Sequence, residues 1–330
     1  MVMGATSGIG EACAHRLAEQ GFLVIAVGRD RPGRADAVVA ALTAASNESV
    51  KSLNTGTGTG TTSTSVPAHE FYACDAFSLK SVQETAKKIQ TKHSRIDALV
   101  MTQGMATTQG FTPTPIEGND EKLTLHYYSR MAMLYCLLPA LMKKATTDDT
   151  MPAVVISVLS GGVHSAYKNY SKDPSLKDSY SIKNAADAAG YYNDLGLDQV
   201  ALNYAAQRTT DNISLRELCV VHASPGFVNT NWGTEFHPIL RNVVRFVQGL
   251  GGKPAAECAE FLMGSTVVAA EAGDPLPQRP DNNQKQTSGV FVVDQYGEPA
   301  TLTKEHTPEA RDFVWKHTKD VLHKAGISID

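Results

Sequence analysis

The sequence predicts an α/β fold in which helices cover both faces of one parallel sheet, giving three layers, α/β/α. Short apolar runs alternate with helical patterns from one end of the chain to the other. Several runs are apolar at nearly every position, which is typical of parallel strands covered on both faces. A glycine-rich turn also precedes the first helical pattern. These observations favour a doubly wound sheet with right-handed crossovers, built by residues 1–330 as a single domain.

The apolar runs place the strands of this sheet. They are expected at residues 22–28, 70–75, 97–104, 153–160, 218–226 and 289–297. A further strand, central in the sheet, has only residues 1–3 available before the glycine turn. Because a strand usually takes about five residues, this first strand looks truncated, as if the native chain started upstream of Met1.

Helical patterns fill the intervals between the strands. They lie at residues 11–21, 78–93, 122–145 and 194–210, and a closing amphipathic helix is expected near the carboxyl end. Residues 51–68, rich in Gly, Thr and Ser, are expected to form a flexible loop. Residues 165–190 form a polar insert between the fifth strand and the next helix. Loops at the carboxyl ends of strands border the ligand crevice, so we expect this insert at the active site.

Composition narrows the class of protein. The net charge is −4 and the pI about 6.2, which offers no electrostatic reason to expect nucleic acid or an anionic membrane as a partner. The five cysteines are scattered without a CxxC pair, so we predict free thiols and neither a disulfide framework nor a metal site. The sequence predicts no signal peptide, and it contains no 18-residue apolar run. We therefore expect a soluble, cytoplasmic protein.

The glycine-rich turn "GATSGIG" spans residues 4–10 and opens the first helix. Glycines permit a tight turn and close approach to a pyrophosphate, and the helix amino terminus adds N–H donors. The turn thus predicts dinucleotide binding by Gly4, Thr6, Ser7, Gly8, Ile9 and Gly10. Arg29 and Asp30 follow the second strand. Arginine there suits the 2′-phosphate of NADP, so Arg29 favours NADP(H) over NAD(H); the alternative is a solvated arginine beside Asp30.

These motifs resemble those of the short-chain dehydrogenase/reductase family, whose fold is Rossmann-type. The turn is similar to the family's TGxxxGxG, and "ISVLSGG" (156–162) resembles its catalytic-serine strand. The resemblance covers about residues 3–265 and implies further cofactor-binding residues. These are Asp75 in "ACDAFS", Gly104 in "LVMTQG", and Pro225, Gly226, Val228 and Thr230 in "SPGFVNT". It also implies hydride transfer between a nicotinamide cofactor and a small-molecule carbonyl or alcohol.

The resemblance implies a serine, a tyrosine and a lysine four residues after that tyrosine. Ser160 matches the serine, and Tyr192 in "GYYNDLGLDQV" (190–200) is the predicted tyrosine, with Tyr191 as the rival. The lysine position then falls on Gly196 or on Leu195, so the cation is missing. Tyrosine has an ordinary pKa near 10, and a neighbouring cation favours its ionised form. The absence of this lysine therefore affects proton transfer by the tyrosine.

Other residues are candidates for this missing function. His126 stands at the family's asparagine position and is a candidate proton relay, or an ordinary helix histidine. Arg130, four residues later, lies on the same helix face and would add positive charge. Lys183 in the insert is a candidate replacement for the amine, or a solvated loop lysine.

The expected function is NADP(H)-dependent reduction of a carbonyl compound, with Tyr192 as the acid and Ser160 as the carbonyl anchor. The alternative is a catalytically impaired family member that binds NAD(P) for a structural or redox-sensing role. In family terms, residues 231–263 form a substrate lid, and helices 122–145 and 194–210 pair in a homodimer or homotetramer. The sequence does not name the substrate.

Overall fold

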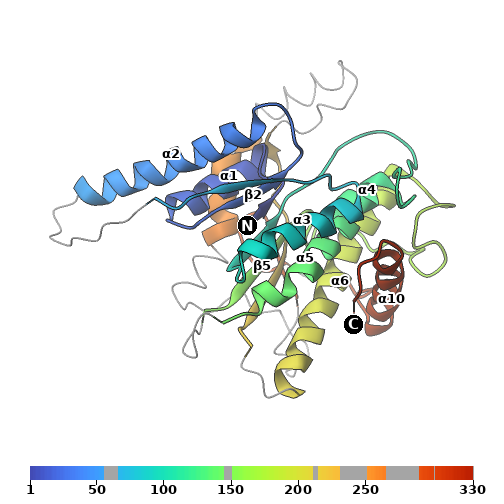
Figure 1. Ribbon diagram of the computed structural model, residues 1–330. Helices are drawn as coiled ribbons and strands as arrows, with labels where there is room; N and C mark the ends of the chain where they lie inside the picture. The colour runs from blue at the N-terminus through green and yellow to red at the C-terminus, as the bar shows by residue number, and fades with distance from the viewer. Residues whose placement is uncertain are drawn as a thin grey trace.

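The computed structural model describes residues 1–55, 66–144, 151–210, 215–230, 251–264, 290–300 and 302–329. Seven parallel strands form one sheet in the spatial order β3-β2-β1-β4-β5-β6-β9 (Figure 1). They are β1 (Val2–Met3), β2 (Ile25–Gly28), β3 (Glu70–Ala73), β4 (Ala98–Met101), β5 (Ala153–Val158), β6 (Leu218–Ala223) and β9 (Val290–Val293). The short strands β7 (Val228–Asn229) and β8 (Lys253–Pro254) pair separately. The predicted doubly wound α/β sheet is confirmed.

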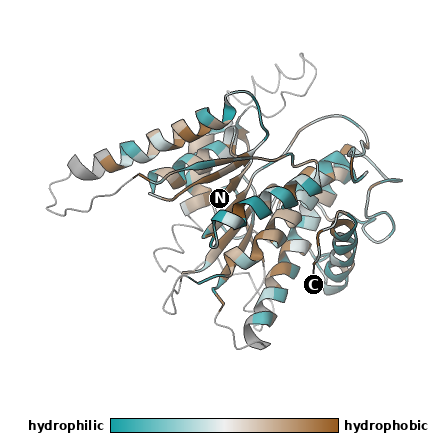
Figure 2. Ribbon diagram, in the orientation of Figure 1, coloured by the Kyte–Doolittle hydropathy of each residue, from teal (hydrophilic) through white to brown (hydrophobic). Residues whose placement is uncertain are grey.

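Helices cover both faces of the sheet (Figure 1). One face carries α1 (Gly8–Glu19), α2 (Arg34–Thr55) and α8 (Ala255–Met263). The other carries α3 (Leu79–Lys92), α4 (Glu121–Leu123), the π-helical turn η1 (Thr124–Tyr128), α5 (Ser129–Leu141) and α6 (Ile182–Thr210), with α10 (Pro308–Lys324) outside α6. In Figure 2 the strands are brown, whereas α3 and α10 show much teal toward solvent. No helix in the described ranges combines the length and apolarity needed to cross a bilayer.

The sheet separates two hydrophobic cores. Successive strand residues point to opposite faces, so Val2 packs in one core and Met3 in the other. Although β1 has two residues, it pairs with β2 on one side and β4 on the other, through Val2 to Ala26 and Val2 to Val100. The short first strand is thus central in the sheet, as the sequence predicts.

The helix that contains the two adjacent tyrosines begins earlier than the sequence suggests. Residue 194 was the predicted start, but α6 begins at Ile182. The Ser181 hydroxyl accepts a hydrogen bond from the Asn184 N–H (3.0 Å), as a helix N-cap does, and an alanine-rich stretch follows. The predicted insert is therefore partly helical, and Tyr192 lies in the third turn of α6.

Two other predicted segments are described only in part. The predicted loop at 51–68 begins inside α2, which continues to Thr55, and residues 56–65 lie outside the described residues. Of the predicted lid at 231–263, residues 231–250 also lie outside them, and the remainder contains β8 and α8.

The carboxyl-terminal helix docks on the sheet's helical layer through buried hydroxyl groups. The Tyr127 hydroxyl and Thr318 Oγ1 share a hydrogen bond of 2.6 Å, and the Tyr128 hydroxyl lies 2.8 Å from His317 Nε2. Burial lowers the pKa of His317 to about 4. The docked form of α10 therefore holds an uncharged imidazole.

Acid is expected to weaken the fold through His317. Its pKa is depressed in the folded chain, so the unfolded chain binds the proton more strongly and stability is lost as pH falls from about 6.5 toward 4. The loss attributable to this residue reaches about 3 kcal/mol. Urea unfolding across this pH range should show a shallower decline in free energy for His317→Gln than for wild type. His323→Gln, at an exposed position of α10, is the control, and equal declines in all three chains would contradict the prediction.

Candidate active site

The turn between β1 and α1 depends on two glycines. Gly4 adopts φ +91°, a conformation that favours glycine. A Cβ at Gly10 would overlap the Gly4 carbonyl oxygen and the Thr102 hydroxyl, so only glycine lets α1 start this close to β4. Arg34 Nη1 donates to the Thr6 carbonyl (3.0 Å) and fixes the turn from the side of α2. The amino terminus of α1 is thereby held at the carboxyl edge of the sheet.

A groove of about 880 Å³ crosses the carboxyl ends of the strands above this turn. Its lining runs from Arg29 after β2, through Thr102 and residues 104–106 after β4, to Leu159 after β5 and Pro225 after β6. Nine of the residues predicted to bind the cofactor line it: Thr6, Ser7, Gly8, Ile9, Gly10, Arg29, Gly104, Pro225 and Thr230. An elongated, glycine-floored groove with a helix amino terminus suits a dinucleotide.

The other predicted cofactor residues lie beside the groove. Gly4 lines an adjoining cavity of about 230 Å³. Asp75 lies between two residues of that cavity's wall, and its Oδ1 accepts from the Phe77 N–H (3.0 Å). Gly226 and Val228 are not part of either lining. Gly226, at φ +68°, instead shapes the turn that leads from Pro225 to β7.

A buried cation lies under the β5 side of the groove. Arg130 on α5 is fully buried, yet it contributes to the groove lining. Its guanidinium donates to Ser157 Oγ (2.7 Å) and to the carbonyls of Val158 (2.9 Å) and Gln103 (2.6 Å). Those partners are all uncharged, and Nε has no partner in the described part of the chain. Burial lowers the pKa of Arg130 to about 9, so the group still carries its charge at neutral pH.

His126 lies in the π-helical turn η1, in the position where the predicted long helix is interrupted. Such turns occur frequently at functional sites. The Met105 N–H donates to His126 Nε2 (3.0 Å), which leaves the ring proton of the neutral form on Nδ1. Burial and the nearby Arg130 lower the pKa of His126 to about 3. His126 is therefore an uncharged residue of the groove wall.

The prediction that Tyr192 faces Ser160 is wrong. Tyr192 is fully buried, and its hydroxyl donates to the Pro174 carbonyl (3.1 Å). The rival Tyr191 donates to the Glu305 carbonyl (2.6 Å). The residue of α6 that faces Ser160 is Gly190, where an added Cβ would lie 2.5 Å from Ser160 Oγ. Both tyrosine hydroxyls thus bind carbonyls away from Ser160, and Ser160 Oγ is buried without a hydrogen-bond partner among the described residues.

Lys183 does not replace the missing amine. It lies in the first turn of α6 with an exposed side chain and pairs with Asp187 one turn later. Because Gly190 faces Ser160, it occupies the place expected of the tyrosine, and the residue four positions later is Asp194, a carboxylate rather than a lysine. On the β5 side of the groove, the lining includes the positive charge of Arg130.

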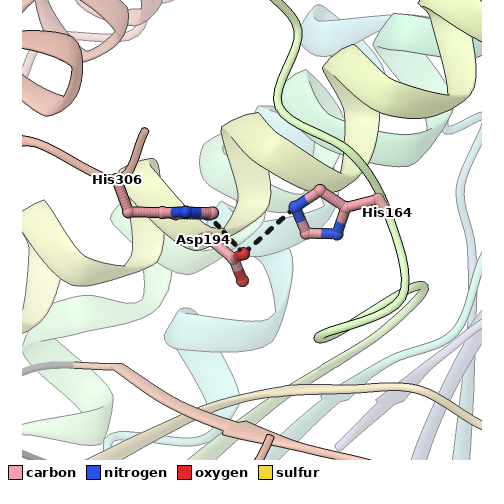
Figure 3. A group of neighbouring side chains, drawn as sticks. All are labelled: His164, Asp194 and His306. Atoms are coloured by element: carbon pink, nitrogen blue, oxygen red, sulfur yellow. Dashed lines mark hydrogen bonds and ion pairs between the residues drawn. The ribbon is translucent and has the colours of Figure 1, made fainter. Parts of the chain in front are cut away.

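Asp194 is surrounded by three histidines that the sequence analysis missed (Figure 3 shows two of them). Its Oδ1 lies 2.6 Å from His222 Nδ1, and its Oδ2 lies 3.1 Å from His164 Nε2 and 2.9 Å from His306 Nε2. Burial alone would raise the pKa of Asp194, but the three rings hold it well below its usual range. For His164, burial opposes protonation, while Asp194 raises the pKa above its ordinary value.

The fold and this groove define a Rossmann-type α/β protein, and comparison with known proteins agrees. The family model described as "Enoyl-(Acyl carrier protein) reductase" matches residues 4–172, about half of the chain. The NmrA-like family domain-containing oxidoreductase notO of an Aspergillus species is 24% identical over 98% of this chain and 89% of its own length.

Solved structures are similar at the level of the fold. A short-chain dehydrogenase of Shigella flexneri, complexed with NADP, superposes with a TM-score of 0.52 at 16% identity, over 89% of this chain and 95% of its own. The 3-oxoacyl-[acyl-carrier protein] reductase of Brucella melitensis, in complex with NAD, gives 0.51 at 16% identity, over 80% and 87%. The chain belongs to the short-chain dehydrogenase/reductase family and is an oxidoreductase of that kind.

Proposed function

We propose that this oxidoreductase binds NADP(H) in the groove and reduces the carbonyl group of a small organic substrate. The observation that carries the proposal is the continuous groove of about 880 Å³ between the amino terminus of α1 and the buried Arg130. Its size and its glycine floor fit a dinucleotide, and Gly8 keeps α1 close to Thr230 on the opposite wall. When bound, the reduced cofactor supplies a hydride. This chain's residues bind, orient and stabilise developing charge.

The choice of NADP over NAD rests on positive charge at the β2 end. Arg29, Arg31 and Arg34 all line the groove there. An extra phosphate on the adenosine ribose would meet these guanidinium groups, which bind phosphate well.

Replacing Arg29 with glutamine should therefore weaken NADPH binding about tenfold to 100-fold and leave NADH binding nearly unchanged. Arg29 is exposed, so the substitution should not disturb the core. Titrations that follow cofactor fluorescence give the dissociation constants of NADPH and NADH for wild type and variant, and hence the change in their ratio. Equal wild-type affinities for NADPH and NADH would remove the case for Arg29.

Arg130 supports the proposal as a substitute for the absent lysine. It places positive charge beneath the β5 side of the groove, and its hydrogen bonds to the Gln103 and Val158 carbonyls fix its orientation. A fixed cation stabilises negative charge more in a buried site than in water. We assign Arg130 to holding the cofactor and stabilising charge during reduction.

His126 supplies the hydrogen-bond donor for the carbonyl oxygen in this proposal. Its Nδ1–H is free of the Met105 contact, and the low pKa keeps the ring neutral at physiological pH. A neutral imidazole can polarise a carbonyl in this way. Water then provides the proton that completes the alcohol. Ser160, whose hydroxyl has no partner among the described residues, is the second donor.

A second candidate is a family member that binds the dinucleotide without turnover. One observation favours it: Gly190 rather than a tyrosine faces Ser160, and the phenols of Tyr191 and Tyr192 are bound to backbone carbonyls. In that case NADP(H) would serve a structural or redox-sensing role.

An NADPH-oxidation screen over aldehydes and ketones separates the two candidates. Turnover should fall by about 10²- to 10⁴-fold in His126→Leu, which removes the N–H that acts on the carbonyl. Tyr192→Phe is the matched control, because its hydroxyl contacts Pro174 and should not affect turnover. Turnover that survives in His126→Leu would remove this assignment. Tight NADPH binding without turnover on any carbonyl would favour the second candidate.

A further inference from the structure

We infer that His164, Asp194 and His306 form a binding site for a divalent transition-metal ion such as Zn²⁺. The three side chains come from the loop after β5, the middle of α6 and the segment before α10 (Figure 3). Their ligand atoms all lie within 4.8 Å of one another. Figure 3 shows the two rings converging on one carboxylate oxygen from opposite sides.

The spacing of the ligand atoms fits a coordination sphere. The two imidazole Nε2 atoms lie 3.1 Å and 2.9 Å from Asp194 Oδ2. In a tetrahedral zinc site with bonds near 2.1 Å, neighbouring ligand atoms are about 3.4 Å apart. A small outward movement of the side chains would therefore admit the ion. Two imidazoles and one carboxylate suit Zn²⁺ and leave a fourth position for water.

The hydrogen bonds of His164 indicate a lone pair directed at the carboxylate. Its Nδ1 lies 2.9 Å from the Ser160 carbonyl oxygen, which can only accept, so Nδ1 carries the proton. In the neutral ring, Nε2 is then unprotonated and faces Asp194 Oδ2. This 3.1 Å contact lacks hydrogen-bond geometry, and Nε2 is buried without a hydrogen-bond partner among the described residues. A cation between the two atoms satisfies both.

The surrounding groups orient the ligands as outer-shell groups do around metals. The Ser160 N–H donates to His222 Nε2 (3.2 Å), so His222 Nδ1 carries the proton that binds Asp194 Oδ1. This fixes the carboxylate and leaves Oδ2 for the ion. His306 Nδ1 accepts from the Thr303 N–H (3.1 Å) and also lies 3.2 Å from the Thr303 carbonyl oxygen. When Nε2 binds the ion, the ring proton moves to Nδ1 and that carbonyl oxygen accepts it, which is how metal-ligating histidines are commonly held.

The site is buried but has a route from solvent. The three ligand side chains are between 1% and 5% exposed, so the ion would be shielded from water. A cavity of about 140 Å³ lined by Asp194, His306 and Arg311 opens beside them and has room for a water ligand. The positive charge of Arg311 is paired with Asp198 (3.1 Å). The inference does not depend on the proposed function, because these ligands lie outside the groove lining.

The experiment uses the full chain, treated with a chelator and then titrated with Zn²⁺. We expect one zinc ion per chain by elemental analysis, a rise in melting temperature on zinc addition, and absorption bands of tetrahedral Co²⁺ when cobalt replaces zinc. His164→Gln and His306→Gln should each weaken zinc binding at least about 100-fold and abolish the temperature shift. His323→Gln, an exposed histidine of α10, is the control and should bind zinc as wild type does.

Two results would overturn the inference. One is a wild-type chain that takes up no zinc, which would make the cluster a hydrogen-bonded Asp–His network only. The other is zinc uptake that both glutamine variants retain while they remain folded by circular dichroism, because the ion would then bind elsewhere. Zinc uptake by the wild-type chain still tests whether the protein binds zinc, even if a variant fails to fold.

Discussion

Substituting methionine for Arg130 is expected to weaken NADPH binding about 100-fold, equivalent to about 2.7 kcal/mol, with a smaller effect on the unliganded chain. Two opposing effects keep the change in stability of the unliganded chain small. The variant loses hydrogen bonds to Ser157, Val158 and Gln103, but it also removes a buried cation whose described partners are uncharged. Only the liganded chain loses an attraction without compensation, because the cofactor's phosphates carry the opposite charge.

Thermal unfolding with and without NADPH measures both the stability of the unliganded chain and the gain in stability from cofactor binding. Wild type should gain stability on addition of saturating cofactor, and Arg130→Met should lose most of that gain. Arg130→Lys is the matched variant, since it keeps the charge but not the planar set of donors, and an intermediate affinity is expected. A cofactor-induced shift of wild-type size in Arg130→Met would show that the guanidinium does not contribute to binding.

Replacing Gly10 with alanine is expected to weaken NADPH binding about 10- to 100-fold and to destabilise the fold by about 1–3 kcal/mol. The added methyl group would overlap the Gly4 carbonyl oxygen and the Thr102 hydroxyl. Because one of these is a backbone atom, α1 itself must move away from the turn. The N–H groups at its amino terminus then no longer point into the groove.

Gly110→Ala is the control for this substitution, because a Cβ at that position meets nothing within 4 Å. Cofactor affinity from fluorescence titration and stability from urea unfolding should both stay near wild type in the control. If Gly10→Ala binds NADPH as tightly as wild type, the close approach of α1 to β4 is unimportant for the cofactor.

The sheet could be predicted from the sequence because its signal is local. Each strand of the seven-stranded sheet lies within a predicted apolar run or within residues 1–3, and the glycine turn marks the start of α1. Most of the predicted cofactor residues line one groove for the same reason, since they follow strands whose order the fold class already determines.

The catalytic residues could not be predicted from local sequence patterns, because their assignment depended on where α6 begins. The polar residues before Gly190 resemble a loop, and counting from a late helix start selected Tyr192. Had Gly190 been recognised as the residue that faces Ser160, the position four residues later, Asp194, would have been identified as part of the site. The cluster around Asp194 has no sequence signature at all, because His164 and His306 lie 142 positions apart and meet only through the packing of α10 on α6.

The position of β1 also has a consequence for how the chain acquires its structure. Val2 and Met3 lie between β2 and β4, and β4 begins only at Ala98. The middle of the sheet therefore cannot close until about a hundred residues are available, and every strand pair requires a crossover. Parallel sheets with such distant pairings fold slowly, often over milliseconds to seconds. During synthesis, β1 must therefore wait for β4, its second partner, and we expect late ordering of β1 to slow refolding.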